Sequence, residues 1–224
     1  MQGESREIRW SWLGSMPFEE ANRLQEELRE EIKTGRGSDH LLLLEHEPPV
    51  ITLGRNANAS ELLADADWLR ERGIEVVECD RGGQLTYHGP GQLIGWPVLN
   101  LSPDRRDVRR FVRDLQTVLV RVLHDHGVEA EGRPMPQVGV WTDAGKIASI
   151  GIHLSRWITT HGFALNVTTE LDHFRGIVPC GLPEVEMVSL EGLAGEAPEL
   201  PEVAETVVRH FGGVFQRPMV RSQP

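Results

Sequence analysis

Cysteine and lysine side chains at two places in the sequence could carry out nucleophilic chemistry together. Cys180 stands between Pro179 and Gly181, which favour an irregular segment, whereas Cys79 lies in an apolar run typical of a buried strand. A thiol with an ordinary pKa of about 8.5 is roughly a few per cent thiolate at neutral pH, and a nearby ammonium group raises that fraction. Lys146 could supply this ammonium. The two residues are far apart in the sequence, so the residues alone do not show that they meet.

Lys146 follows a glycine at the start of an apolar stretch. A lysine in that position is ordinarily just exposed to solvent. The small residues that come next, Ala148, Ser149 and Gly151, leave room for a ligand beside the strand. An exposed lysine and a lysine in a site therefore both remain open from the residues themselves.

A glycine-rich stretch, RGGQLTYHGPGQ, occupies residues 81–92 between the apolar runs 74–79 and 93–99. Glycines between two strands mark a place where the backbone bends sharply or comes close to another group. An ordinary hairpin would also explain the glycine pairs. However, the two glycine clusters bracket a histidine and the only tyrosine of the chain, which favours a loop that faces a ligand.

Together these motifs resemble those of the lipoyl(octanoyl) transferases, the acyltransferases of lipoic acid biosynthesis. The matching stretches are RGGQLTYHGPGQ at 81–92, GKIASIG at 145–151, HGFALNV at 161–167 and VPCGL at 178–182. The resemblance extends from about Leu41 to Leu190, with the motifs in the family's order. It implies a single α+β domain over residues 1–224, with a mixed β-sheet flanked by helices as in the lipoate and biotin protein ligases.

The resemblance also implies roles for individual residues. Cys180 would be the nucleophile, and Lys146 would be its catalytic partner. The residues implied to line the substrate site are Arg81, Gly82, Gly83, Gln84, Leu85, Thr86, Tyr87, His88, Ser149, Ile150, Gly151, Gly162, Phe163 and Ala164.

The implied reaction has two acyl transfers. Cys180 would take an octanoyl group from acyl carrier protein as a thioester, and a lysine of a lipoyl domain would then attack it to give an amide. The implied acceptors are the lipoyl domains of 2-oxoacid dehydrogenase E2 subunits and the glycine cleavage H protein. Because the thioester supplies the energy, the resemblance implies that neither ATP nor a metal nor any other cofactor is needed.

Three other functions remain open. An ATP-dependent lipoate or biotin ligase could share the fold, but it would consume ATP and would not need Cys180. An amidotransferase that moves octanoyl between lipoyl domains would also use a cysteine and would differ in its donor. A non-catalytic module that binds acyl carrier protein is disfavoured because both Cys180 and Lys146 are present.

Composition argues against several broad classes of protein. A formal net charge of −11 argues against general nucleic-acid binding. No apolar run is long enough to predict a membrane span or the core of a signal peptide. With only two cysteines, a disulfide framework is not indicated, and the reduced cytoplasm is the expected location. The nine histidines show no paired ligand spacing, so we expect no metal site.

One further motif is rejected. Gly139 with Gly145-Lys146 is similar to a phosphate-binding loop, but the spacing is too long and Ile147 replaces the required serine or threonine.

Hydrophobic periodicity predicts a mixture of helices and strands. Helices are predicted over residues 18–32, 61–71 and 104–126. Strands are predicted over residues 8–12, 41–45, 50–53, 74–79, 137–141, 146–154, 156–160 and 163–167.

The predicted helix 104–126 has an apolar face and a basic face. The apolar face comprises Val108, Phe111, Val112, Leu115, Val118, Leu119 and Val122. The opposite face comprises Arg105, Arg106, Arg109, Arg110 and Arg113. A run of charges is usually a solvated face. Because the implied partners are acidic proteins, docking of a partner on this face is an equally open interpretation.

Overall fold

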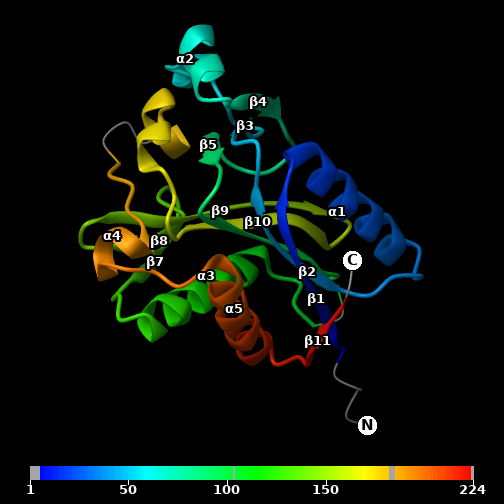
Figure 1. The fold of residues 1–224 in the computed structure, drawn as a ribbon. Helices are drawn as coiled ribbons and strands as arrows, with labels where there is room; N and C mark the ends of the chain where they lie inside the picture. Colours follow the sequence, from blue (N-terminus) through cyan, green and yellow to red (C-terminus); the bar gives the residue numbers. More distant parts are fainter. Residues whose placement is uncertain (1–5, 103, 182–184, 223–224) are drawn as a thin grey trace.

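The computed structural model describes residues 6–102, 104–181 and 185–222, and for Cys180 it describes the backbone but not the side chain. These residues form two β-sheets, with helices packed on both faces of the larger one (Figure 1). The predicted α+β class, with a mixed sheet flanked by helices, is confirmed.

The larger sheet has eight strands in the order β11-β1-β2-β6-β10-β9-β8-β7. Its strands are β1 (Ile8–Met16), β2 (His40–His46), β6 (Gln92–Val98), β7 (Glu131–Arg133), β8 (Gly139–Thr142), β9 (Gly145–Ser155), β10 (Ile158–Asn166) and β11 (Met219–Arg221). β1 pairs in parallel with β2 and β11, and the remaining neighbours pair antiparallel.

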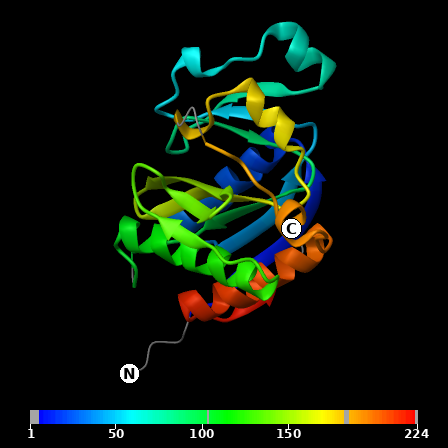
Figure 2. The same cartoon turned by 90° about the vertical axis from the view of Figure 1, so that its left-hand side faces the viewer.

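Helices bury the central strands of this sheet from both sides. Every residue of β6 and β10 is buried. α3 (Val108–Asp125) and α5 (Leu200–Phe215) cover one face, and α1 (Phe18–Lys33) lies on the other (Figures 1 and 2). Strands covered on both faces are near-continuous apolar runs, which is the pattern that predicted residues 41–45 as a strand. No helix in the described parts of the chain is both long and apolar enough to cross a membrane.

α3 begins at Val108, later than predicted. The side chain of Asp107 accepts the N–H of Arg110 at 2.9 Å and so caps the helix there. The residues that α3 buries are Phe111, Leu115, Gln116, Val118, Leu119, Val122 and Leu123. The prediction for Val108 was wrong, because it lies in the first turn and is 37% exposed.

The smaller sheet has three strands in the order β4-β3-β5: β4 (Glu75–Glu78), β3 (Val50–Leu53) and β5 (Leu85–His88). It lies on the side of the larger sheet away from α3 and α5 (Figures 1 and 2). The glycine-rich stretch 81–92 is therefore not a hairpin, because β5 belongs to the smaller sheet and β6 to the larger one.

The predicted helix 61–71 is confirmed only from Ala66 onward, and its predicted start was wrong. A short 3-10 helix, η1 (Ala59–Glu61), comes first, and α2 (Ala66–Glu71) starts separately. Between them Leu62 forms an antiparallel bridge with Ile177, which is distant in the sequence. Asp65 then accepts the N–H of Trp68 at 2.8 Å and caps α2. A tertiary contact thus interrupts a segment with helical spacing.

The predicted strands 156–160 and 163–167 are one strand, β10. Arg156 and Trp157 form the turn between β9 and β10, with φ of 51° and 65°, so the predicted start at Arg156 was wrong. β7 and β11, which were not predicted, have three residues each, too few to show a period. The remaining elements are α4 (Leu190–Ala194), η2 (Leu171–Gly176) and η3 (Pro179–Gly181).

Candidate active site

The pairing of β9 with β10 brings two of the motifs side by side. Ser149 lies opposite Ala164, Ile150 opposite Phe163, and Gly151 opposite Gly162. A Cβ at Gly162 would overlap the backbone oxygen of Gly95 on β6. These stretches are therefore adjacent and use small side chains where backbones come close.

The start of the glycine-rich stretch lies against the same part of β9. The N–H of Gly82 donates to the oxygen of Ile152 at 2.9 Å. A Cβ at Gly151 would lie 2.8 Å from the oxygen of Gly82, so a larger residue there would push the loop away. Three of the predicted site segments thus meet at one place, around Gly82, Gly151 and Gly162.

The Arg81 side chain holds the start of the glycine-rich stretch through hydrogen bonds. Its Nη2 donates to the oxygens of Thr52 and Gln84, both at 2.7 Å, and its Nε donates to Thr52 Oγ1 at 3.1 Å. The residue is buried. The guanidinium therefore ties the end of β3 to the glycine-rich stretch.

The side chains of β5, predicted to line the substrate site, are all buried. Tyr87 and His173 form a hydrogen bond, with 2.8 Å between the phenol oxygen and Nδ1, and burial raises the pKa of the Tyr87 phenol. His88 Nδ1 lies 2.8 Å from Gln92 Oε1, and burial holds the pKa of His88 well below its ordinary value. Both side chains are therefore uncharged at neutral pH and packed within the protein.

Lys146 is buried, which contradicts the interpretation of an ordinary exposed lysine. Its exposed fraction is 1%, and its Nζ lies 5.7 Å from the centroid of the Trp141 ring. A Cβ at Gly139 would lie 2.6 Å from Lys146 Cε, so the glycine makes room for the lysine stem. The backbone of Lys146 pairs with the segment after Cys180, through Glu186 at 2.8 Å and Val188 at 3.0 Å.

Cys180 lies on η3, which contacts β5. A Cβ at Gly181 would overlap the side-chain carboxamide of Gln84. The segment that carries Cys180 thus lies against the glycine-rich stretch, whereas the Cys180 side chain is outside the described part of the structure. Cys79 directly follows β4, which is a largely exposed strand and not the buried one predicted; the residue is half-buried, and burial raises the pKa of its thiol.

Comparison with known proteins identifies the family. Residues 17–212 match the model of the lipoyl protein ligase A/B catalytic domain. The chain belongs to this family. An octanoyltransferase from Solibacter usitatus is 49% identical over 210 residues, which cover 93% of this chain and 93% of that protein.

Solved structures of ligases have the same fold as this lipoyl protein ligase A/B family member. A bipartite lipoate protein ligase from Thermoplasma acidophilum, described with its E2 lipoyl domain, has a TM-score of 0.74 at 20% identity and covers 97% of this chain and 87% of its own. A biotin protein ligase from Aquifex aeolicus, in complex with biotin and ATP, has a TM-score of 0.59 at 14% identity, with 93% and 70% coverage. The fold predicted from the motifs is confirmed.

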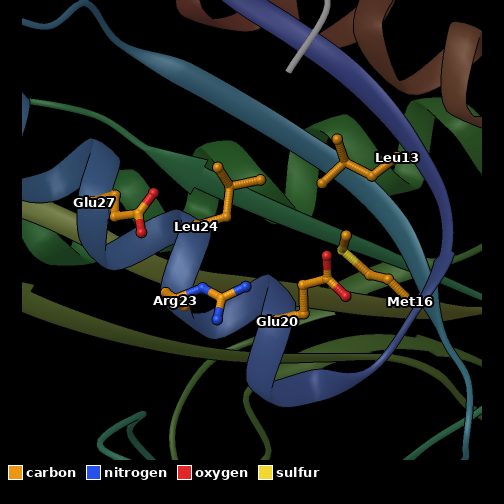
Figure 3. Close-up of a pocket in the computed structure, with 6 residues that line it drawn as sticks. All are labelled: Leu13, Met16, Glu20, Arg23, Leu24 and Glu27. Carbon is orange, nitrogen blue, oxygen red and sulfur yellow. The ribbon is translucent and has the colours of Figure 1, made fainter.

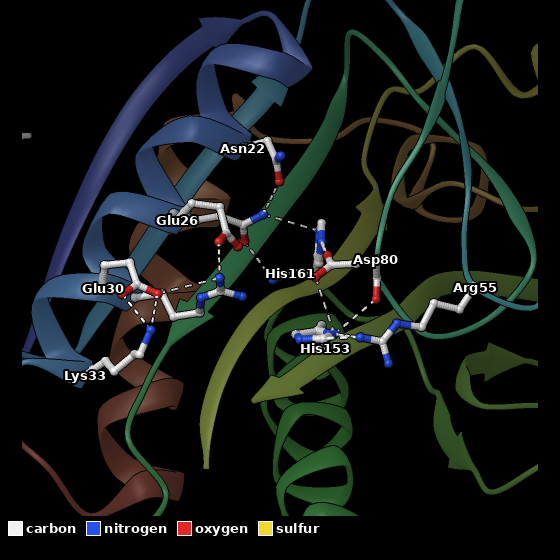
Figure 4. A network of polar contacts seen from close by, with 10 residues as sticks. Asn22, Glu26, Glu30, Lys33, Arg55, Asp80, His153 and His161 are labelled. Carbon is white, nitrogen blue, oxygen red and sulfur yellow. Dashed lines mark hydrogen bonds and ion pairs between the residues drawn. The ribbon is translucent and has the colours of Figure 1, made fainter. Parts of the chain in front are cut away.

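Sequence reasoning missed a polar network beside the site of this family member (Figure 4). His161 Nε2 lies 2.8 Å from Asp80 Oδ1, and the backbone N–H of His161 donates to Gln25 Oε1 on α1 at 2.7 Å. The hydrogen bond from His161 holds the pKa of Asp80 well below its ordinary value, at about 2. Burial lowers the pKa of His161 despite the nearby carboxylate. A signal was available, because Asp80 and His161 each directly precede a site residue, Arg81 and Gly162.

The same network reaches the surface through His153 and Arg55. His153 Nδ1 lies 3.2 Å from the backbone oxygen of Asp80 and also contacts the Arg55 guanidinium. Figure 4 shows His153 and His161 beside Asp80, with Arg55 extending to His153.

A second buried histidine, His46, was also missed. Its Nδ1 lies 3.2 Å from the oxygen of Met16, and its ring centroid lies 5.4 Å from that of Trp96 and 5.7 Å from that of His88. Burial lowers the pKa of His46 to about 4. In this lipoyl protein ligase A/B family member, the paired rings of His46 and His88 are therefore buried and neutral at neutral pH.

Arg105 does not belong to the predicted basic face. It is buried, its Nε donates to Asp114 at 2.7 Å, and its Nη2 donates to the oxygen of Val214 at 3.1 Å. Arg105 precedes α3 and connects that helix to α5. Its guanidinium carbon also lies 4.6 Å from the centroid of the Phe215 ring on α5. The exposed arginines are Arg106, Arg109, Arg110 and Arg113.

A groove of about 260 Å³ lies between β1 and α1 (Figure 3). Its lining is Leu13, Met16, Glu20, Arg23, Leu24 and Glu27. None of the residues predicted for the site contributes to it. In the described residues, no group of three or more histidine, cysteine, aspartate and glutamate side chains is placed to hold a metal ion.

Proposed function

We propose that this chain is an octanoyltransferase of lipoate biosynthesis, which passes an octanoyl group from acyl carrier protein through Cys180 to a lysine of a lipoyl domain. The observation that carries the proposal is the packing of the Cys180-bearing turn against Gln84 of the glycine-rich stretch. The Solibacter usitatus octanoyltransferase, 49% identical over nearly the whole chain, supports the choice of reaction.

The first transfer forms one thioester and breaks another. The Cys180 thiolate attacks the thioester carbonyl of octanoyl acyl carrier protein, and the carrier leaves as a thiolate that takes up a proton. In the second transfer, the amine of the acceptor lysine attacks the acyl-enzyme, and the nitrogen loses a proton to solvent as the amide forms. The Cys180 thiolate is then released, so no net oxidation or external energy source is required.

Lys146 has two tasks in this scheme. As a buried ammonium, it favours the thiolate of Cys180, because charges interact more strongly where water is excluded. In the first transfer it gives its proton to the departing carrier thiolate. The neutral Lys146 amine then takes a proton from the incoming lysine ammonium, so that the acceptor amine becomes nucleophilic. Its burial against Trp141 and Gly139 supports these tasks, since lysine is rarely fully buried in proteins.

The octanoyl chain lies in this proposal between the β9–β10 small-residue pairs and the glycine-rich stretch. Ser149 and Ala164 have small side chains beside the sheet, Gly151 and Gly162 let the backbones of Gly82 and Gly95 come close, and the stretch from Arg81 to His88 forms the wall. Backbone N–H groups of that stretch are the proposed donors to the thioester oxyanion. The close approach of Gly82 to Gly151 supports a shared wall.

The proposed partners are octanoyl acyl carrier protein as donor and, as acceptors, lipoyl domains of 2-oxoacid dehydrogenase E2 subunits and the glycine cleavage H protein. The Thermoplasma acidophilum ligase with the same fold is described with an E2 lipoyl domain, which supports the acceptor class. We place the reaction in the reducing cytoplasm, where a free Cys180 thiol persists. The whole chain, residues 1–224, acts as one catalytic domain.

Mass spectrometry of the intact protein tests this function. Mixing with octanoyl acyl carrier protein, without ATP, should add one octanoyl group, and addition of a lipoyl domain should transfer it to a lysine there. An ATP-dependent ligase is the second candidate, because solved ligases share the fold. Modification of the lipoyl domain only with free octanoate and ATP would select that alternative and reject the octanoyltransferase.

A further inference from the structure

Glu61 holds the segment that carries Cys180 from two sides. Glu61 is the last residue of η1 and lies outside the four sequence motifs. Its backbone oxygen accepts the N–H of Val178 at 2.8 Å, just before Cys180. Its carboxylate Oε1 accepts the Nε2–H of Gln84 at 2.9 Å.

Gln84, which Glu61 holds, contacts the residue on the other side of Cys180. Its carboxamide lies directly against Gly181, the residue after Cys180. Gly181 has a φ of +67°, which favours glycine, and any Cβ there would overlap the carboxamide. The position of the Gln84 side chain therefore limits where the turn can lie.

Glu61 is itself firmly held. Its Oε2 accepts the N–H of Asn58 at 3.2 Å, and its own N–H donates to the oxygen of Asn58 at 2.9 Å. The next residue, Leu62, bridges to Ile177. The segment 58–62 thus has hydrogen bonds of its own and pairs with residues 177 and 178.

In the part of the turn that the structure describes, the backbone hydrogen bond that closes it is long. η3 has three residues, and the N–H of Gly181 donates to the oxygen of Val178 at 3.3 Å, a long hydrogen bond. Among the described residues, the contacts that support the turn include those from Glu61 and Gln84 and the bridge between Leu62 and Ile177.

We propose that Glu61 is a positioning residue, which sets the place of the Cys180 nucleophile through Val178 and Gln84. The inference rests on the proposed function, in which Cys180 accepts the octanoyl group. A displacement of about 1 Å in a reacting group costs roughly 100-fold in rate. Loss of Glu61 should therefore slow acylation of Cys180, with little effect on the affinity for the donor.

A single-turnover experiment on the full chain tests this. Formation of the octanoyl adduct is followed by intact mass at saturating octanoyl acyl carrier protein, over a range of pH. Glu61→Ala should lower the plateau rate constant by roughly 10- to 100-fold, with less than about a threefold change in the half-saturating donor concentration. Glu61→Gln should keep most of the rate, because its carboxamide oxygen can still accept from Gln84. Glu75→Ala, which removes an exposed carboxylate on β4, is the control and should react normally.

A charge swap separates positioning from general damage to the fold. Gln84→Glu alone places two carboxylates together and should slow acylation. The Glu61→Gln/Gln84→Glu double variant restores a carboxylate–carboxamide hydrogen bond with the roles exchanged, so it should recover rate relative to Gln84→Glu. Rates are compared at the pH plateau, where the Cys180 thiol is fully ionised in each variant.

The outcomes are distinct. If Glu61→Ala lowers the melting temperature but leaves the plateau rate unchanged, or if the swap recovers nothing, the positioning role of Glu61 is overturned while the octanoyltransferase proposal stands. If Cys180→Ser still forms the adduct in the same assay, the proposed function itself fails.

Discussion

His161 Nε2 lies 2.8 Å from Asp80 Oδ1, which joins the centre of β10 to the residue directly before Arg81. His161 has a φ of +55°, and its backbone N–H is held by Gln25 of α1. Because the pKa of His161 is lowered by burial and that of Asp80 is about 2, the pair at neutral pH is a neutral imidazole that donates to a carboxylate. His161 therefore connects Asp80, the residue before the glycine-rich stretch, to both α1 and the larger sheet.

Removal of the contact between Asp80 and His161 should affect substrate binding. Asp80→Ala should raise the KM for octanoyl acyl carrier protein a few-fold and change kcat less, because the loop from Arg81 to Gly83 loses one of its supports. Steady-state kinetics with the carrier as varied substrate measure this. Asp67→Ala, an exposed carboxylate on α2, serves as the matched control. An unchanged KM in Asp80→Ala would show that the loop is held without the His161 contact.

Replacement of Cys180 should abolish transfer. Cys180→Ser lacks the thiolate, so neither the octanoyl adduct nor the lipoyl-domain product should form. Cys79→Ser should leave both largely intact, because the Cys79 thiol is half-buried with a raised pKa and points to the oxygen of Leu53 at 3.5 Å. Intact mass and product assays on both variants check this. Near-normal turnover by Cys180→Ser would refute the nucleophile assignment.

Lys146→Ala should lose activity in both half-reactions. Without the buried ammonium, the thiolate fraction of Cys180 at neutral pH should fall, and the pH midpoint of its alkylation by iodoacetamide should move upward. Lys33→Ala, at the exposed end of α1, should alkylate like the wild type. An identical alkylation profile in Lys146→Ala would show that Lys146 does not tune the thiol.

Acid should destabilise the protein in part through His46. Because burial lowers the pKa of His46 to about 4, this imidazole is neutral in the folded protein at pH 5 but protonated in the unfolded chain. The unfolded state therefore binds more protons between about pH 6.5 and pH 4, and the free energy of unfolding falls as the pH is lowered through that window. Between pH 7 and pH 5 the expected contribution of this histidine is about 2 kcal/mol.

The variant His46→Phe should show a smaller difference in the free energy of unfolding between pH 7 and pH 5 than the wild type. Urea denaturation at the two pH values measures this difference. His124→Asn, at an exposed position on α3, should behave like the wild type. If His46→Phe retained the full pH dependence, the loss of stability would have to come from other groups, such as the neighbouring His88 and His161.

The exposed arginines of α3 give a prediction about the donor. If the acidic carrier protein docks on this face, charge reversal at Arg109 and Arg110 should raise its KM several-fold, on the order of 1 kcal/mol for each close charge pair that is broken. Turnover at saturation and the KM for octanoyl-CoA should change less. Arg36→Glu/Arg70→Glu, a double reversal at exposed positions outside α3, makes the same change in net charge and is the control. Equal KM values for wild type and double variant at low salt would identify a solvated face only.

The sequence by itself determined the periodic elements and the motifs. The apolar spacing in 18–32 and the continuous apolar run 41–45 predicted α1 and much of β2, because their burial follows from local pattern and overall composition. The order of the four motifs led to the correct family and fold.

Tertiary structure alone decided which of those residues are desolvated and which meet. Lys146 and Arg105 lie in segments whose local pattern suggests exposure, yet both are buried. Gly139 on the paired strand β8 leaves space for the Lys146 stem, and α5, distant in the sequence, covers Arg105. The bridge between Leu62 and Ile177 split a segment with helical spacing. Burial of ionisable groups and contacts across the sheet depend on packing between distant segments, which no local period records.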